Sequence, residues 1–470
     1  METVSKFSLN WFLILLLFFA LIFWGVMMPP QIIVFFIGGI ILLLFAAFSL
    51  FKPIVLVYFI ILSSAFAGIL EIFDSFNLGT TELSISGIRW ILTGGIILVI
   101  MTIASSKVRL LKQHIPFLLF AIWVTFRWGI SSHNANGLKD ILFYSLPSLI
   151  WIYTIFVLVL SKNKELLFKK LETLLLYCAL VPLFLYVILI PIGLIHLSKN
   201  GPDGLFGPRA VTTFLLIILS LSLANWKYAV SRKQKRLGIF ISLVTFSLIL
   251  FTLSRMTTIT GLVLIALFRL KSPKFTKVFI GGTLGMVLAG LILLGIPSFR
   301  ERLFFSTPRN INEVFSSFDT QGRGNYWTVT YAHAIQSPWI GWGPGTARIL
   351  IANTYYQGRF SEYHPHNEYL QVFHDTGIIG LLLVLSAWIP IQLSYWKKWL
   401  VADLSKNLML AKWNMAATLS ILVVLMNSLV DNTLHYTFVL GPVFIIVSCA
   451  NVLNLEKNEK QPEKRHANSK

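Results

Sequence analysis

Long apolar runs recur along almost the whole chain and are separated by short polar or basic joints. Most are long enough to cross a hydrocarbon layer about 30 Å thick as helices. Helices are favoured because unpaired backbone N–H and C=O groups in lipid are costly. Joints at Pro29-Pro30 and Phe51-Lys52-Pro53 allow hairpins or half-crossings, so we expect about 12–14 spanning helices. The apolar runs lie near 11–28, 31–50, 53–70, 86–104, 115–130, 141–160, 171–195, 210–225, 238–254, 257–270, 278–296, 377–396, 413–430 and 436–453.

Lysine and arginine are concentrated in alternate joints, which predicts the orientation of the chain because basic loops stay on the cytoplasmic side. The basic joints are 107–112, 162–170, 227–236, 269–277 and 397–412. The opposite side receives the acidic stretch 71–85, the joint 196–209 and a long loop at about 297–376. We therefore expect both termini in the cytoplasm and the long loop outside the cytoplasmic membrane.

The composition agrees with a membrane protein and excludes a water-soluble globule with one core. Hydrophobic residues make up 56% of the 470 residues, charged residues make up 12%, and the mean hydropathy is +0.76. The prediction is an all-α polytopic bundle over 1–453, with short helices in its large extracytoplasmic loop at 297–376. A polar, disordered cytoplasmic tail at 454–470 follows.

The apolar run after Lys6 has no small-x-small cleavage site before Pro29-Pro30, so we expect a retained first helix.

The formal net charge of +20 is largely a topology signal rather than a sign of nucleic-acid binding. Lysines dominate the predicted cytoplasmic side, whereas the outer basic residues are mostly arginines. The positive-inside preference does not explain that outer set, but a planar guanidinium that binds two phosphate oxygens at once does. We therefore expect an anionic ligand at the outer face. The outer set is Arg89, Arg127, Lys139, Lys199, Arg209, Arg255, Arg300, Arg302, Arg309, Arg323, Arg348 and Arg359.

Three of these arginines are candidate ligands of a diphosphate. Arg255 follows Ser254 between two apolar spans, where a charged side chain is costly and persists mostly with a partner or a function. Snorkelling to the interface is the alternative. Arg209 follows a glycine-proline turn that opens a helix, so a phosphate there would also meet free N–H groups and a favourable dipole. Arg323 is a weaker candidate, since charged loop residues are usually solvated.

The end of the long loop carries a candidate proton acceptor. His364-Pro-His366-Asn367 precedes an apolar segment, and Gly377-Ile-Ile-Gly380 opens the next span. Imidazole is the commonest general base near neutral pH, so His366 is suited to take a proton from an acceptor hydroxyl. The alternative is an interfacial histidine beside a helix cap at Asn367. A further alternative is a zinc site formed by His364, His366, Glu368, His374 and Asp375. The extended geometry that Pro365 imposes on the two nearest histidines disfavours it.

The His366-Asn367 pair, the nine residues after it and Gly377-x-x-Gly380 resemble the signature of the bacterial O-antigen ligase and polymerase superfamily. Ser254-Arg255 at an outer helix joint is similar to that family as well. Two departures are Met256, where the family has a small residue, and the 210–213 segment, where it tends to carry asparagine. The resemblance covers residues 205–395 best.

The resemblance implies a metal-independent, inverting glycosyltransferase that needs no cofactor. Such an enzyme moves a glycan from an undecaprenyl-diphosphate carrier to an acceptor hydroxyl at the outer face of the cytoplasmic membrane. On this interpretation His366 is catalytic, and no residue binds a metal. The diphosphate ligands are Arg255, Arg209 and Arg323, and the supporting residues are Asn367, His364, Gly377 and Gly380.

The sequence leaves the acceptor open. A carrier-linked repeat would make the protein a polysaccharide polymerase, and lipid A core would make it an O-antigen ligase. A Ser or Thr side chain would make it a protein O-oligosaccharyltransferase. A flippase or exporter of the lipid-linked saccharide is the alternative from another class. The expected partners are the donor, a glycan or lipid acceptor, membrane lipid, and a flippase and chain-length regulator of the same pathway, but not nucleic acid.

Overall fold

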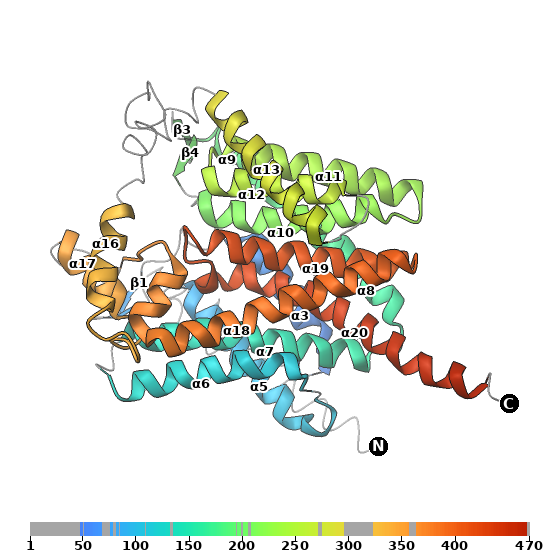
Figure 1. The fold of residues 1–470 in the computed structure, drawn as a ribbon, viewed down its shortest axis with the longest axis horizontal. Helices are drawn as coiled ribbons and strands as arrows, with labels where there is room; N and C mark the ends of the chain where they lie inside the picture. The colour runs from blue at the N-terminus through green and yellow to red at the C-terminus, as the bar shows by residue number, and fades with distance from the viewer. Residues whose placement is uncertain are drawn as a thin grey trace, which may run out of the picture. The chain divides into compact units, whose positions relative to one another are not determined.

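The computed structural model divides into two compact units, Met1–Leu56 and Val57–Lys470, and the arrangement below is that of the second (Figure 1). The predicted span at 11–28, almost all of that at 31–50 and the predicted loop before Arg323 lie outside the described residues. The structure describes residues 48–67 except 50, 76–78, 81–83, 85–131 except 109, 135–193, 195–198, 201–204, 208–270, 275–295, 323–356 and 363–467.

Helices form nearly all of the regular structure in these ranges. The first group comprises α3 Ile54–Ala65, α5 Ile85–Ile103, α6 Ile115–Gly129, α7 Ala135–Leu160, α8 Lys164–Tyr177, α9 Leu180–Leu189, α10 Pro208–Lys227, α11 Arg232–Phe251, α12 Arg255–Arg269 and α13 Phe275–Gly295. The second comprises α16 Arg323–Ala334, α17 Thr346–Tyr356, α18 Glu368–Leu404, α19 Leu408–Asn427 and α20 Thr437–Ala467. Short 3-10 turns are η2 Ser105–Lys107, η3 Lys112–His114 and η4 Thr433–His435.

Two short antiparallel hairpins interrupt the helical pattern. Strands β1 Phe76–Leu78 and β2 Thr81–Leu83 form one hairpin, and β3 Ile195–Ser198 and β4 Gly201–Gly204 form the other. The sequence did not predict them, because three or four residues carry too few positions to show an alternating pattern.

Side-chain caps explain where four of the helices begin. The residue before each helix accepts a hydrogen bond from the backbone N–H three positions later, which satisfies a donor that the helix leaves unpaired. The caps are Asn163 for α8, Ser231 for α11, Asn367 for α18 and Asn407 for α19.

The centre of the second unit is formed by α10, α19 and α20. Helix α10 packs against α11, α12 and α19, while α20 packs against α7 and α19. Every residue from 211 to 225 in α10 is buried, the polar Thr212, Ser220 and Asn225 among them. Helix α18 lies against α6 and α19 and brings the His366 segment to this core.

The structure confirms an all-α polytopic membrane bundle. Within the described part of the chain, six helical segments are long and apolar enough to span a membrane. The predicted runs at 86–104, 115–130, 210–225, 257–270 and 278–296 also form helices, namely α5, α6, α10, α12 and α13. The six segments are Asn136–Leu160, Lys164–Leu189, Arg232–Phe251, Glu368–Leu404, Leu408–Asn427 and Thr437–Lys457.

Helix α20 extends beyond the last predicted span. It continues to Ala467, past the apolar run at 436–453. The disorder expected for the tail at 454–470 stays a prediction.

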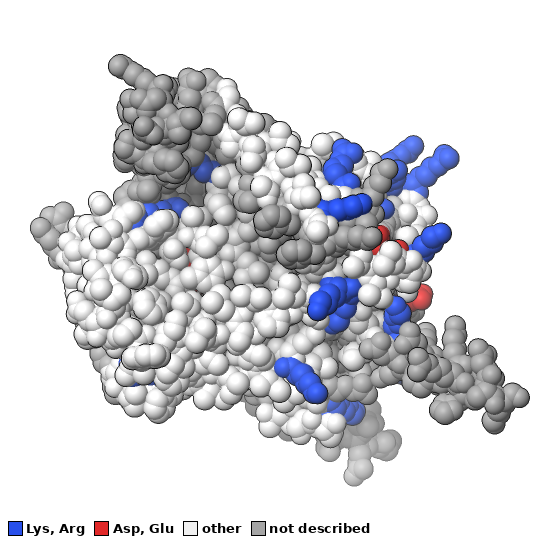
Figure 2. Space-filling model, in the orientation of Figure 1, with Lys and Arg blue, Asp and Glu red and all other residues white. Residues whose placement is uncertain are grey.

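Exposed lysines and arginines gather at the ends of the helices that lie away from α16 and α17 (Figure 2). These residues belong to the α7–α8, α10–α11 and α18–α19 joints and to the helix ends beside them. They include Lys162, Lys169, Lys170, Arg232, Lys233, Lys235, Arg236, Lys397 and Lys406. The His366 segment begins α18 at the opposite end, next to α16 and α17.

Candidate functional site

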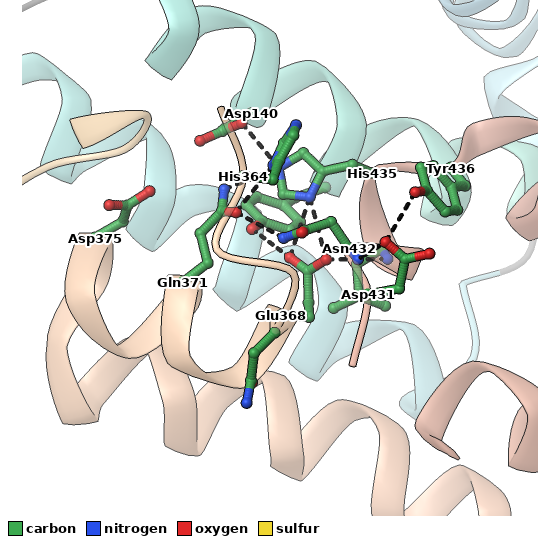
Figure 3. Close-up of polar contacts among 12 residues, drawn as sticks. Asp140, His364, Glu368, Gln371, Asp375, Asp431, Asn432, His435 and Tyr436 are labelled. Carbon is green, nitrogen blue, oxygen red and sulfur yellow. Dashed lines mark hydrogen bonds and ion pairs between the residues drawn. The ribbon is translucent and has the colours of Figure 1, made fainter. Parts of the chain in front are cut away.

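His366 faces a carboxylate from a distant part of the chain. Its Nδ1 atom lies 3.3 Å from Oδ1 of Asp431, which follows α19. The Tyr436 hydroxyl donates to the same oxygen at 3.0 Å (Figure 3). The His366 and Asp431 side chains are 17% and 10% exposed, so His366 remains partly accessible while Asp431 is largely buried. When Nδ1–H donates to the carboxylate, Nε2 keeps the lone pair that a base needs.

The backbone around His366 is held in an unusual conformation. His366 has a φ of 54°, in the left-handed region that residues other than glycine rarely adopt. The indole N–H of Trp327 in α16 donates to the Pro365 carbonyl at 2.9 Å. On the other side, the Asn367 side chain accepts from Leu370 N at 3.0 Å and caps α18. These contacts fix the imidazole relative to α16 and α18.

A buried charged network lies next to this pair. His435 contacts Asp140 of α7 at 2.9 Å and Glu368 of α18 at 3.2 Å (Figure 3). Arg348 of α17 forms an ion pair with the same Asp140. Tyr144 donates to Glu368 at 2.8 Å. We call the four charged residues Asp140, Arg348, Glu368 and His435 the charge cluster, and all four are buried.

His435 carries a positive charge in this surrounding. Burial alone would lower its pKa, but the carboxylates of Glu368 and Asp140 and their hydrogen bonds outweigh that effect and raise the pKa to about 10. As an imidazolium, His435 donates from both ring nitrogens. With Arg348 it balances the two carboxylates, as buried charges require.

His364 has a different state from His435. Burial, followed by the positive charges of Arg348 and His435, lowers its pKa well below the usual range. Its Nδ1 lies 3.1 Å from Oε1 of Gln371, which also accepts from the Asn432 amide at 2.7 Å. A neutral His364 thus supports the site through Gln371.

Asp375 is the centre of a second hydrogen-bond network. Its carboxylate accepts from the backbone N–H groups of Gly345 at 3.0 Å and Ala347 at 2.8 Å, so it binds the start of α17. It also contacts His374 Nδ1 at 2.7 Å, and His374 Nε2 lies 2.9 Å from Nδ1 of His333. Glu368 and Asp375 thus each contact a histidine, namely His435 and His374.

The two glycines of the motif allow the chain to pack closely. Gly377 interrupts α18 with φ 70° and ψ −173°, and a Cβ atom there would overlap the backbone of Trp339. At this break Ile378 N donates to the Pro338 carbonyl at 2.8 Å. A Cβ atom at Gly380 would collide with Thr376. The prediction that the next span starts at Gly377 agrees with this break, because one helical segment of α18 ends there and the next begins.

The arginines fall into two groups, and the first corrects an expectation. Arg89 donates to the Ser63 carbonyl at 3.0 Å, Arg127 donates to the Gly341 carbonyl at 2.9 Å, and Arg348 pairs with Asp140. All three are buried. Their place in the predicted outer set therefore reflects protein contacts and does not by itself imply an anionic ligand.

The second group contains the three arginines assigned to the diphosphate. Arg323 opens α16 and donates to the Val430 carbonyl at 2.7 Å, beside Asp431. Arg255 is half-buried at the first position of α12. Arg209 lies in the first turn of α10, and its side chain lies outside the described part of the structure.

Sequence reasoning missed Asp140, Asp431 and His435. Each lies in or next to an apolar span, where an ionisable residue is costly and marks a functional or paired position. That signal was present in the sequence. The partners could not be inferred, because they join α7, α18 and the 428–436 segment across the fold.

The fold and the site define a class: a multi-spanning helical membrane protein with a histidine–carboxylate site at one end of its helices. A comparison with protein-family models matches residues 237–385, from α11 to the middle of α18, to the O-antigen ligase family. This segment confirms the resemblance to the O-antigen ligase and polymerase superfamily and supports a membrane enzyme of glycan assembly. A search of curated proteins finds no match.

Proposed function

We propose that this protein transfers a glycan from an undecaprenyl-diphosphate carrier to an acceptor hydroxyl at the outer face of the cytoplasmic membrane. The observation that carries the proposal is the partly exposed His366 with its partner Asp431, in a chain with an O-antigen ligase segment. The products that fit best are an extended polysaccharide or a glycan joined to lipid, made by a polymerase or an O-antigen ligase.

The proposed reaction uses His366 as general base. The acceptor oxygen attacks the anomeric carbon from the face opposite the diphosphate, and its proton passes to Nε2 of His366. The bond between the anomeric carbon and the phosphate oxygen breaks, and the carrier diphosphate leaves with inversion at that carbon. The Asp431 carboxylate stabilises the imidazolium that forms, as a carboxylate partner does in other histidine bases.

The leaving diphosphate requires positive charge, for which we propose Arg255, Arg209 and Arg323. A guanidinium binds two phosphate oxygens at once and offsets the charge that develops as the bond breaks. Arg323 reaches the His366–Asp431 pair, since it donates to the carbonyl of Val430, the residue before Asp431. We propose a reaction without a metal, since protein donors already engage the carboxylates of Asp140, Glu368 and Asp375.

The distribution of charge supports the outer face as the place of reaction. Basic joints remain on the cytoplasmic side of membranes. Exposed lysines and arginines lie at the end away from α16 and α17, and His366 begins α18 at the other end. On this topology His366 meets lipid-linked donors outside the cytoplasm rather than soluble nucleotide sugars.

A reconstitution experiment tests the proposal. The full chain is placed in liposomes with an undecaprenyl-diphosphate-linked oligosaccharide, and new glycosidic bonds are measured by mass spectrometry alongside translocation of the donor. We expect longer carrier-linked glycan, or glycan on an added lipid acceptor, with unchanged yield in the presence of a chelator. Translocation without bond formation would favour the exporter. Loss of transfer with chelator, restored by zinc, would favour the metal site.

A further inference from the structure

We infer that His435 is a positioning residue: through the charge cluster it ties the 428–436 segment to the start of α18 and so holds Asp431 against His366. The inference rests on the proposed role of His366 as base and adds what maintains that base in a working geometry. His435 and Asp140 lie outside the segment that matches the O-antigen ligase family, whereas Arg348 and Glu368 lie within it.

Glu368, at the start of α18, contacts the 428–436 segment on both sides of Asp431. It lies two residues after His366, and its backbone N–H donates to the Ser428 carbonyl at 2.9 Å. Its carboxylate accepts from Leu434 N at 3.2 Å and contacts His435 at the same distance. Asp431 lies between these two attachments, so its place relative to His366 depends on them.

His435 connects this link to the rest of the bundle. Its other nitrogen contacts Asp140 of α7, which also pairs with Arg348 of α17. The 428–436 segment is therefore fixed to three helices, α7, α17 and α18, through one imidazolium. Removing that charge would leave two buried carboxylates with one cation, an arrangement that buried groups do not tolerate without rearrangement or proton uptake.

The exposure of these groups separates positioning from chemistry. The side chains of Asp140, Glu368 and His435 are at most 4% exposed, whereas the His366 side chain is 17% exposed. Substrate would therefore meet His366 rather than the charge cluster. A displacement of about 1 Å at a reacting group can reduce the rate about 100-fold, so a positioning residue has a large effect without touching substrate.

Histidine NMR on the full chain in detergent tests the inference independently of glycan transfer. The titration of the His366 imidazole is followed in the wild type and in His435→Gln. We expect its midpoint to fall by about one pH unit in the variant, because an imidazole that loses a facing carboxylate binds its proton less tightly. Transfer of the carrier-linked oligosaccharide should fall about 100-fold in kcat with little change in KM.

Two further variants separate positioning from general damage. Glu172→Gln breaks a buried ion pair with Lys412 near the start of α19, far from the segment that follows this helix. It should lower thermal stability but leave the His366 titration unchanged. His435→Gln combined with Glu368→Gln removes one charge of each sign, so it should fold even where the single variant does not, and should show the same His366 shift.

The outcomes distinguish this inference from the proposed function. An unchanged His366 titration in both His435 variants would overturn the positioning role, even if the wild type transfers glycan. If the His435 variants shift the His366 titration but the wild-type protein forms no glycosidic bond, the positioning role is retained and the proposed function is overturned. An equal shift in Glu172→Gln would show a global effect and overturn the inference.

Discussion

At the scale of single residues, the sequence indicated a candidate for the chemistry but not the partners of that candidate. His366 was chosen from its residue type and motif, and the structure places it 3.3 Å from Asp431. The buried arginines show the opposite case. Arg348 and Asp140 lie 208 residues apart in sequence, so no local pattern could show that the guanidinium binds the protein's own carboxylate.

Arg255 offers a prediction in which charge and geometry give different results. Arg255→Lys keeps the charge but loses the forked grip on two oxygens. If Arg255 binds the donor diphosphate, losing one charge-assisted hydrogen bond costs about 1.5–3 kcal/mol and lowers transfer roughly 10- to 150-fold. The measurement is the reconstituted transfer rate at several donor concentrations.

The control for this prediction is Arg232→Lys. Arg232 is exposed at the start of α11, at the basic end of the helices. We expect its conversion to lysine to leave the rate unchanged. Equal rates for the two lysine variants would remove Arg255 from the diphosphate site and make the exporter a stronger alternative.

At the scale of elements, the apolar runs predicted the helices well, because a long apolar run in a membrane protein has few other stable forms. The break in α18 was predictable only in part. The Gly377-x-x-Gly380 spacing indicated the start of a span, and the structure has a break at Gly377, where the 337–343 turn packs against the helix. Which segment inserts at a glycine depends on tertiary contacts that hydropathy does not contain.

Gly377 gives a prediction at this scale. Its φ of 70° and ψ of −173° lie in a region that only glycine adopts readily, and strain there costs about 1–3 kcal/mol. Gly377→Ala should therefore lower the free energy of unfolding by at least that amount, since its Cβ atom also overlaps the Trp339 backbone. Thermal unfolding of the detergent-solubilised protein measures the change.

Gly95→Ala is the matched control within α5. A Cβ atom at Gly95 meets nothing within 4 Å, and alanine is the better helix former by roughly 0.5–1 kcal/mol. This variant should be as stable as the wild type or slightly more so. If Gly377→Ala matched it, the strain at the α18 break would have no energetic role.

At the scale of the whole molecule, the proposed orientation makes a prediction about accessibility. Single cysteines at Thr328 in α16 and at Lys233 in α11 replace exposed residues at opposite ends of the helices. The cells are treated so that an outer membrane, where there is one, becomes permeable and the cytoplasmic membrane stays intact. A membrane-impermeant thiol reagent should then label the cysteine at position 328 and not the one at position 233. The two native cysteines are buried and should give little background.

The opposite labelling pattern would place His366 on the cytoplasmic side. The histidine site would then face soluble nucleotide sugars, and a lipid-linked donor at the outer face would be excluded. Orientation is therefore a condition for the proposed reaction, independent of the residues that perform it.

The central claim is that His366 removes the acceptor proton in a transfer from a lipid diphosphate. The most direct measurement compares wild type and His366→Ala in liposomes containing the carrier-linked oligosaccharide, at equal amounts of folded protein. The account predicts normal insertion of the variant, no detectable new glycosidic bond, and only a mild loss for His364→Ala. Bond formation by His366→Ala at the wild-type rate would contradict it.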